Sequence, residues 1–167
     1  QVYSGFGVIP ADLNCDPIGQ FVTQGTIRGD IDDSLLRVGD LAHYVAQEYG
    51  QVSTIRVDGS PYAHAGADHV TELAALTSTG IKYLQIMCDS GIEIEDAFRQ
   101  ILVVVTVGTD QFLDIAKIRA FREIWGRVAD RMRLILQQHP RVKGIQVMND
   151  NGSYLVSAYA KRWITDT

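Results

Sequence analysis

Apolar side chains recur every three or four residues between Thr109 and His139, and this spacing predicts one long amphipathic helix. Its expected inward face carries Phe112, Ile115, Ile118, Phe121, Trp125, Val128, Met132 and Ile135. Thr109 or Asp110 can cap the first N–H groups, and Pro140 ends the helix. Residues 101–107 are almost all aliphatic, which is typical of a strand covered on both faces. Residues 101–139 therefore predict one strand–helix unit of a parallel sheet.

The rest of the chain alternates in the same way. Asp16 followed by Pro17 is a favourable helix start, and Asp32 or Asp33 is expected to cap the next helix. Gly80 lies inside a further predicted helix, where it costs about 1 kcal/mol relative to alanine unless a neighbour packs there. The predicted helices span 17–25, 32–49, 67–87, 94–99 and 153–164, the strands lie within 1–9 and at 52–57, 101–107 and 142–148, and residues 58–61 and 149–152 are loops.

This alternation of helices with covered strands indicates a parallel α/β sheet or barrel. A complete (β/α)8 barrel needs about 250 residues, so 167 residues can hold only part of one. No apolar run approaches the roughly 20 residues that span a bilayer, and no signal peptide is visible. Because the first residue is Gln1 and not methionine, we expect a piece of a longer protein.

The net charge and the cysteine content argue against a nucleic-acid-binding protein and against a disulfide-bonded one. The net charge is −5 and no cluster of lysine and arginine forms a basic stripe, which argues against a nucleic-acid partner. Cys15 and Cys88 do not form a CxxC pair, so two free thiols are expected in preference to a disulfide. Apolar residues make up 46% and charged residues 21% of the chain, as in an ordinary soluble globular protein.

Candidate chemistry lies where strands end, because α/β proteins hold their functional groups in the loops after the strands. Asp58 and His64 can be interpreted as an acid–base pair, whereas a side-chain turn between Asp58 and Ser60 is the commoner outcome of such a sequence. The three stretches of this kind are 12–16, 58–66 and 148–152.

The sequence evidence for a metal, nucleophile or phosphate site is weaker than that for the Asp58–His64 pair. His64, Asp68, His69 and Glu72 lack the spacing of a metal-binding helix, so no metal site is expected. The chain has no G-x-S-x-G elbow and no phosphate-binding glycine loop. Composition and spacing alone therefore indicate a soluble α/β domain without an assigned activity.

Two helices carry a family resemblance. Residues 66–84, GADHVTELAALTSTGIKYL, resemble the "GA…QELA…TG..Y" helix of methylmalonyl-CoA mutases. Residues 110–120, DQFLDIAKIRA, followed by Ile124-Trp125, look like the "FF.EIAK.RAAR.LWA" helix of that family. Residues 16–19, with Gly25-Thr26 after them, are similar to a segment that follows an earlier barrel strand. The resemblance extends over about residues 12–165.

The resemblance implies a fold and a reaction. Members of the family isomerise acyl-CoA thioesters, such as methylmalonyl-CoA to succinyl-CoA, by adenosylcobalamin radical chemistry. The acyl-CoA threads a (β/α)8 barrel, and a separate C-terminal domain holds the cobalamin. Some bacterial enzymes pair a catalytic large subunit with a related small subunit that lacks activity.

Departures from the family pattern indicate which subunit this chain resembles. Asn14 stands where catalytic members carry a glutamine, and Pro61 stands where the histidine of "SGYH" contacts the thioester carbonyl. Gln100 and Leu102 replace the Arg and Ser of "RLSFF", which face the substrate. Proline cannot polarise a carbonyl and leucine cannot bind a polar group, so no catalytic residue is expected here. His64, three positions on, is the weaker alternative source of the lost imidazole.

The expected fold is therefore α/β, built from parallel β/α units of the TIM-barrel type, about half of a (β/α)8 barrel, in one domain over 1–167. We interpret the chain as a segment of the non-catalytic small subunit, inactive alone and located in the cytoplasm, or in the mitochondrial matrix of a eukaryote. The alternatives are a substrate-binding fragment of a catalytic subunit and an unrelated enzyme that uses Asp58 and His64.

Cofactor and partner expectations follow from the same resemblance. The cobalamin motif D-x-H-x-x-G is absent from the sequence, so adenosylcobalamin is expected in the parent complex and not on this chain. An incomplete barrel exposes strand edges and apolar helix faces. The expected partners are therefore the catalytic mutase subunit or the remaining parts of the parent chain, with self-association as a further outcome.

Overall fold

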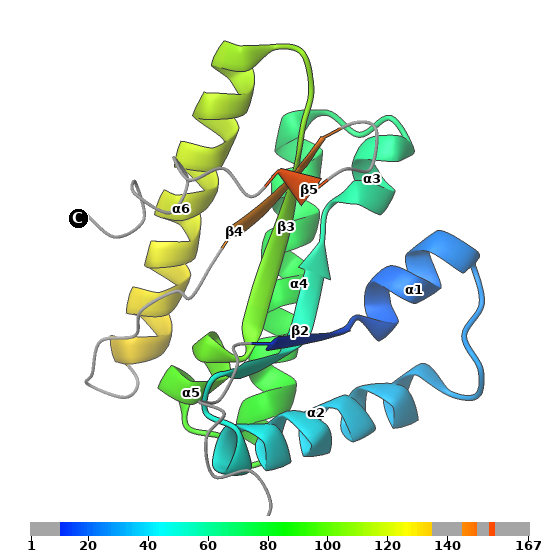
Figure 1. The fold of residues 1–167 in the computed structure, drawn as a ribbon, viewed down its shortest axis with the longest axis vertical. Coiled ribbons are helices and arrows are strands. Elements are labelled where there is room, and N and C mark those ends of the chain that lie inside the picture. Colours follow the sequence, from blue (N-terminus) through cyan, green and yellow to red (C-terminus); the bar gives the residue numbers. More distant parts are fainter. Residues whose placement is uncertain (1–10, 135–144, 150–153, 156–167) are drawn as a thin grey trace, which may run out of the picture.

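The computed structural model describes residues 11–134, 145–149 and 154–155, and the side chains of residues 11–131. Its centre is one sheet with strand order β1-β2-β3-β4-β5 (Figure 1). The first four strands are parallel neighbours, and β5 is antiparallel to β4. The strands are β1 (Ala11–Cys15), β2 (Val52–Asp58), β3 (Ile101–Val107), β4 (Ile145–Asn149) and β5 (Tyr154–Leu155). The prediction of an α/β fold built from parallel β/α units is thus confirmed.

Helices connect the parallel strands. They are α1 (Pro17–Gln24), α2 (Ile31–Glu48), α3 (Ser60–His64), α4 (His69–Asp89), α5 (Ile94–Arg99) and α6 (Gln111–Leu134). Helix α4 packs against β2 and contacts both α2 and α6 (Figure 1). Side chains of these elements and of β2 and β3 form the main hydrophobic core. Each helix of the described part is too short or too polar to cross a membrane.

Most predicted elements are present with small shifts at their ends. The strands at 52–57 and 101–107 and the helix at 94–99 are confirmed. Asp16 caps α1 as expected, whereas α2 is capped by Asp30 and not by Asp32 or Asp33. The strand predicted at 142–148 is observed at Ile145–Asn149. The strand predicted within 1–9 and the end of the long helix after Leu134 lie outside the described residues.

Three short elements differ from the prediction. Strand β1 lacks an apolar pattern in its sequence, and four of its five residues are exposed. It forms through parallel pairing with β2. The expected loop at 58–61 contains the start of α3, a five-residue helix with Pro61 in its first turn. Tyr154–Leu155 pairs with β4 inside the stretch predicted as a helix from 153 to 164, whose other residues are not described.

The buried face of α6 also differs from the prediction in its first half. Phe112 and Ile115 are 83% and 45% exposed, whereas Asp114 and Lys117 are 5% and 4% exposed. The buried face then continues through Phe121, Trp125 and Ala129, which are 0%, 2% and 5% exposed. The apolar spacing was misleading because two of the inward positions carry charges. Met132 and Ile135, also expected inward, lie outside the described side chains.

Gly80 of α4 faces the Trp125 ring of α6. The Trp125 ring packs there, stacked on Phe121 at 5.7 Å between ring centroids and edge-on to Phe98 at 5.6 Å. A Cβ atom at position 80 would lie 2.7 Å from Trp125 Cζ3, which is closer than van der Waals contact allows. The helix-propensity cost of Gly80 is therefore offset by aromatic packing between the two helices.

We predict that Gly80→Ala lowers the free energy of unfolding by about 1–3 kcal/mol, because the added methyl group overpacks the Trp125 contact. Gly126→Ala in α6 is the matched control, since nothing lies within 4 Å of the position that its methyl group would take, and alanine favours the helix by up to about 1 kcal/mol. Urea unfolding of both variants gives the comparison. Equal stabilisation by the two substitutions would contradict the packing argument.

Candidate functional site

The carboxyl ends of β1, β2 and β3 lie at one edge of the sheet because the three strands are parallel neighbours. We call this edge, with Asp16, Asp58, Thr106 and Gly108, the carboxyl edge. Two of the stretches singled out in the sequence, 12–16 and 58–66, meet here. In the third, Met148 and Asn149 belong to β4, and 150–152 lie outside the described residues. The carboxyl edge is therefore the candidate functional site.

Asp16 joins the first strand to α1 and α4. Its Oδ1 accepts hydrogen bonds from the Gly19 N–H at 2.8 Å and from the Tyr83 hydroxyl at 2.6 Å. The Tyr83 oxygen in turn accepts a bond from the Ile18 N–H at 3.0 Å. Burial raises the pKa of Asp16, and the two hydrogen bonds oppose that rise. Burial and the neighbouring Asp16 charge raise the pKa of Tyr83. Both groups serve to hold α1 and α4 in place.

Asp58 ends β2 and has two partners. Its Oδ2 accepts a bond from Arg56 at 2.7 Å, and its Oδ1 accepts a bond from the Ser60 N–H at 2.9 Å. The Asp58–Ser60 turn suggested by the sequence is thus present. His64 is exposed at the end of α3, and no hydrogen bond joins it to Asp58 within residues 11–131. The two groups singled out as an acid–base pair therefore have separate surroundings.

A buried ion pair lies between α4 and α6 beside the end of β3. Lys117 Nζ is 2.9 Å from Glu72 Oε2, and the two side chains are 2% and 1% exposed. Glu72 Oε1 accepts bonds from the N–H and the hydroxyl of Thr106, at 2.9 and 2.7 Å. Asp114 Oδ1 lies 3.4 Å from Lys117, and Asp114 Oδ2 accepts a bond from the Gly108 N–H at 2.8 Å. The carboxyl end of β3 is thus fixed by buried charges.

Glu72 is buried, unlike the other three residues of the His64, Asp68, His69 and Glu72 pattern. Asp68 is exposed and caps α4, accepting a bond from the Thr71 N–H at 2.7 Å, while Glu72 turns into the interior. No group of three or more metal-ligating side chains is found in the described part of the chain. Sequence reasoning missed the Glu72–Lys117 pair, whose only signal was a charge at an inward position of each helix.

Asn14 and Pro61 are the two residues at the carboxyl edge at which the sequence departs from the family pattern that it resembles. The local backbone accounts for each of them. Asn14 has a left-handed backbone with φ of 55°, which asparagine tolerates better than glutamine does, and the β1–β2 register shifts at this point. Its side chain donates to the Asp12 carbonyl at 3.2 Å. Pro61 lies in the first turn of α3, where a missing N–H is harmless. Each residue suits its local backbone.

Gln100 and Leu102 are the other two residues at which the sequence departs from the family pattern. Gln100 lies just before β3, and Leu102 lies within it. Gln100 precedes the strand at its amino end, accepts a bond from the Thr54 hydroxyl at 2.7 Å and donates to the Val52 carbonyl at 3.1 Å. It is 2% exposed, so both ends of its amide are used to join β2 to β3. Leu102 is 8% exposed and is paired in register with Arg56. The structure therefore separates Gln100 from Asn14 and Pro61 along the sheet.

Comparison with known proteins gives the class to which this fold and its motifs belong. The Methylmalonyl-CoA mutase family model matches residues 8–147. A methylmalonyl-CoA mutase small subunit of Streptomyces virginiae is 35% identical over 134 residues, covering 78% of this chain and 21% of that protein. The small subunit of Propionibacterium freudenreichii subsp. shermanii is 34% identical over 119 residues, covering 71% of this chain and 18% of that protein.

The chain therefore belongs to the methylmalonyl-CoA mutase family. Its relationship is small-subunit-like, because the mitochondrial methylmalonyl-CoA mutase of Mus musculus is only 25% identical over 136 residues, covering 77% of this chain and 18% of that protein. The chain spans about a fifth of the length of the curated relatives it matches.

We predict that Lys117→Met lowers the free energy of unfolding by about 3–5 kcal/mol, because it leaves the Glu72 and Asp114 carboxylates buried without their shared cation. Adding Glu72→Gln to that variant removes one of the two unpaired charges and should restore part of the loss. Arg127→Met is the control, since Arg127 forms an exposed pair with Glu123 and should cause no measurable loss. Urea unfolding distinguishes these cases, and a Lys117→Met loss as small as that of Arg127→Met would refute the prediction.

We predict opposite pH effects for two helix-capping aspartates. The pKa of Asp16 is raised above 3.8 by burial, so its contribution to stability is full below pH 3.8 and is lost as pH rises through the folded-state pKa. The pKa of Asp68 is lowered by the Thr71 N–H, so its contribution is present above pH 3.8 and is lost on acidification through the folded-state pKa.

Unfolding in urea at a series of pH values from about 3 to about 7, which brackets the unfolded-state pKa of an aspartate, checks these signs. Relative to wild type, Asp16→Asn should gain stability as pH rises above 3.8, and Asp68→Asn should lose stability as pH rises toward 3.8. Curves of the same sign for both variants would show that burial does not govern Asp16.

Proposed function

We propose that this chain is a segment of the non-catalytic small subunit of an adenosylcobalamin-dependent acyl-CoA mutase. In the parent complex, which isomerises methylmalonyl-CoA to succinyl-CoA, the segment contributes about half of a TIM-type barrel as one α/β domain. It acts as a scaffold and partner of the catalytic subunit and takes no part in the chemistry. The identity to relatives named as small subunits supports this proposal.

The observation that carries the proposal is the structural use of the four degenerate positions. Asn14 serves an irregular strand end, Pro61 starts a helix, Gln100 joins two strands and Leu102 is buried in β3. Reactions of thioesters need groups that polarise the carbonyl and bind the polar substrate, and proline and leucine provide neither. The residues at these positions therefore suit a pseudoenzyme.

The proposal extends to cofactor, partner and location. The cobalamin is held elsewhere in the complex, because this sequence has no D-x-H-x-x-G motif. The partner is the catalytic mutase subunit, with which the chain forms a heterodimer. We place the protein in the bacterial cytoplasm, in keeping with relatives from Streptomyces and Propionibacterium, or in the mitochondrial matrix if the source is eukaryotic, in keeping with the mouse relative.

We predict that the purified chain gives no binding heat with methylmalonyl-CoA or with CoA at millimolar ligand. Isothermal titration calorimetry measures this directly, and the intact catalytic subunit titrated with the same ligands is the positive control. Co-expression of the tagged chain with the catalytic subunit of the same organism should yield a stable complex. Micromolar thioester binding by the chain alone would overturn the scaffold interpretation and identify a substrate-binding fragment of a catalytic subunit.

A further inference from the structure

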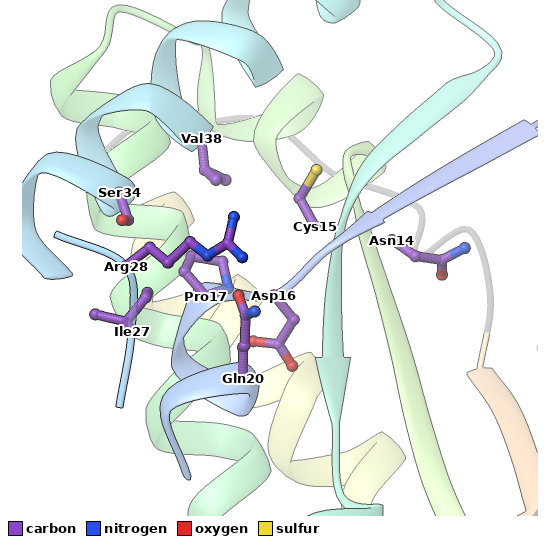
Figure 2. A pocket seen from close by; sticks show the side chains of 9 residues that line it. All are labelled: Asn14, Cys15, Asp16, Pro17, Gln20, Ile27, Arg28, Ser34 and Val38. Carbon is purple, nitrogen blue, oxygen red and sulfur yellow. The ribbon is translucent and has the colours of Figure 1, made fainter. Parts of the chain in front are cut away.

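A cavity of about 500 Å³ lies on the helix side of the sheet, between the end of β1, α1, the following loop and α2. This volume is within the range of small-molecule sites. Pro61, Gln100 and Leu102 do not line it, and Asn14, which does, points away from the other labelled side chains in Figure 2. The cavity therefore adjoins Asn14 but is separate from Pro61, Gln100 and Leu102, and its occupant does not depend on the proposed function.

Arg28 is the cation among the side chains that line this cavity. Its guanidinium extends across the space toward Pro17 and Cys15 (Figure 2). It makes no ion pair with any described residue, although Asp16 lines the same cavity. The Oδ1 atom of Asp16 already accepts hydrogen bonds from the Gly19 N–H and the Tyr83 hydroxyl. The guanidinium of Arg28, an exposed residue, thus keeps hydrogen-bond donors available for a ligand.

The other groups in the cavity neither neutralise this cation nor replace it. Burial raises the pKa of Cys15, so its thiol stays uncharged at neutral pH. The free N–H groups at the start of α1 are already used, since Ile18 donates to Tyr83 and Gly19 donates to Asp16. An anion in the cavity would therefore be held by Arg28 and not by the helix terminus.

The remaining walls combine apolar and polar surfaces. Pro17, Ile27 and Val38 supply apolar contacts, and Gln20 and Ser34 supply an amide and a hydroxyl (Figure 2). A guanidinium binds carboxylates through two parallel hydrogen bonds, and an apolar wall favours a ligand with a hydrocarbon body over a bare ion. We propose that this cavity binds a small organic carboxylate, with its charged group on Arg28 and its short apolar body against Ile27 and Val38.

Titration of the full chain with isobutyrate, followed by NMR of the backbone amides, tests the site. Isobutyrate should cause saturable shifts in residues 15–38 at millimolar concentration. The neutral amide isobutyramide, and inorganic phosphate without an apolar body, should each bind about 10-fold more weakly or not at all. Phosphate binding as tight as that of isobutyrate would overturn the assignment to organic carboxylates.

Three variants locate the binding. Arg28→Gln should weaken isobutyrate binding about 10-fold or more, because it removes a charge-assisted bidentate contact. Gln20→Trp, at an exposed position of α1, should abolish binding by filling the cavity. Arg127→Gln removes an exposed cation on α6 and should leave the affinity unchanged. Equal weakening in Arg28→Gln and Arg127→Gln, or no saturable shift in the wild type, would refute the site.

Discussion

The buried contact between Glu72 and Lys117 constrains the arrangement of the helices around β3. Two opposite charges in the interior are tolerated only when each has its partner and its hydrogen bonds, so α4 and α6 cannot shift independently of each other or of Thr106. The contact also explains a neighbouring glycine. A Cβ atom at Gly59 would lie 2.7 Å from Glu72 Oε1 and 3.1 Å from the Val104 carbonyl oxygen, so the turn after β2 has room for no side chain.

The carboxyl edge of this sheet is occupied by groups that hold the fold together. In parallel α/β proteins the same edge usually carries substrate-binding loops. Here the Asp16 carboxylate binds Tyr83, and the Asp58 carboxylate binds Arg56 and Ser60. A polar group whose hydrogen bonds are made within the protein has little capacity left for a ligand. The hydrogen bonds of these two carboxylates are thus used within the fold.

Local signals in the sequence were enough for the regular elements and for the family. The unbroken aliphatic run of β3 and the Asp16–Pro17 helix start depend on neighbouring residues, and both are as predicted. Strand β1 and helix α3 were missed because they are short and polar and are stabilised by tertiary contacts. The Glu72–Lys117 pair joins residues 45 positions apart, which no local periodicity encodes. Charged side chains at Asp114 and Lys117 also take the buried positions in the first half of α6, where hydrophobic spacing predicted apolar residues.

The left-handed backbone at Asn14 has an evolutionary consequence. A glutamine, the residue that the family resemblance assigns to catalytic members at this position, would have to adopt this conformation at a cost of about 1 kcal/mol or more. The β1–β2 register also shifts at this point, so a glutamine side chain here would point in a different direction from one on a regular strand. Substitution of Asn14 by glutamine alone would therefore change the side chain and leave the irregular strand end unchanged. For the proposed non-catalytic subunit, a site that uses a glutamine here would require the backbone of this strand end to be rebuilt before the residue is exchanged.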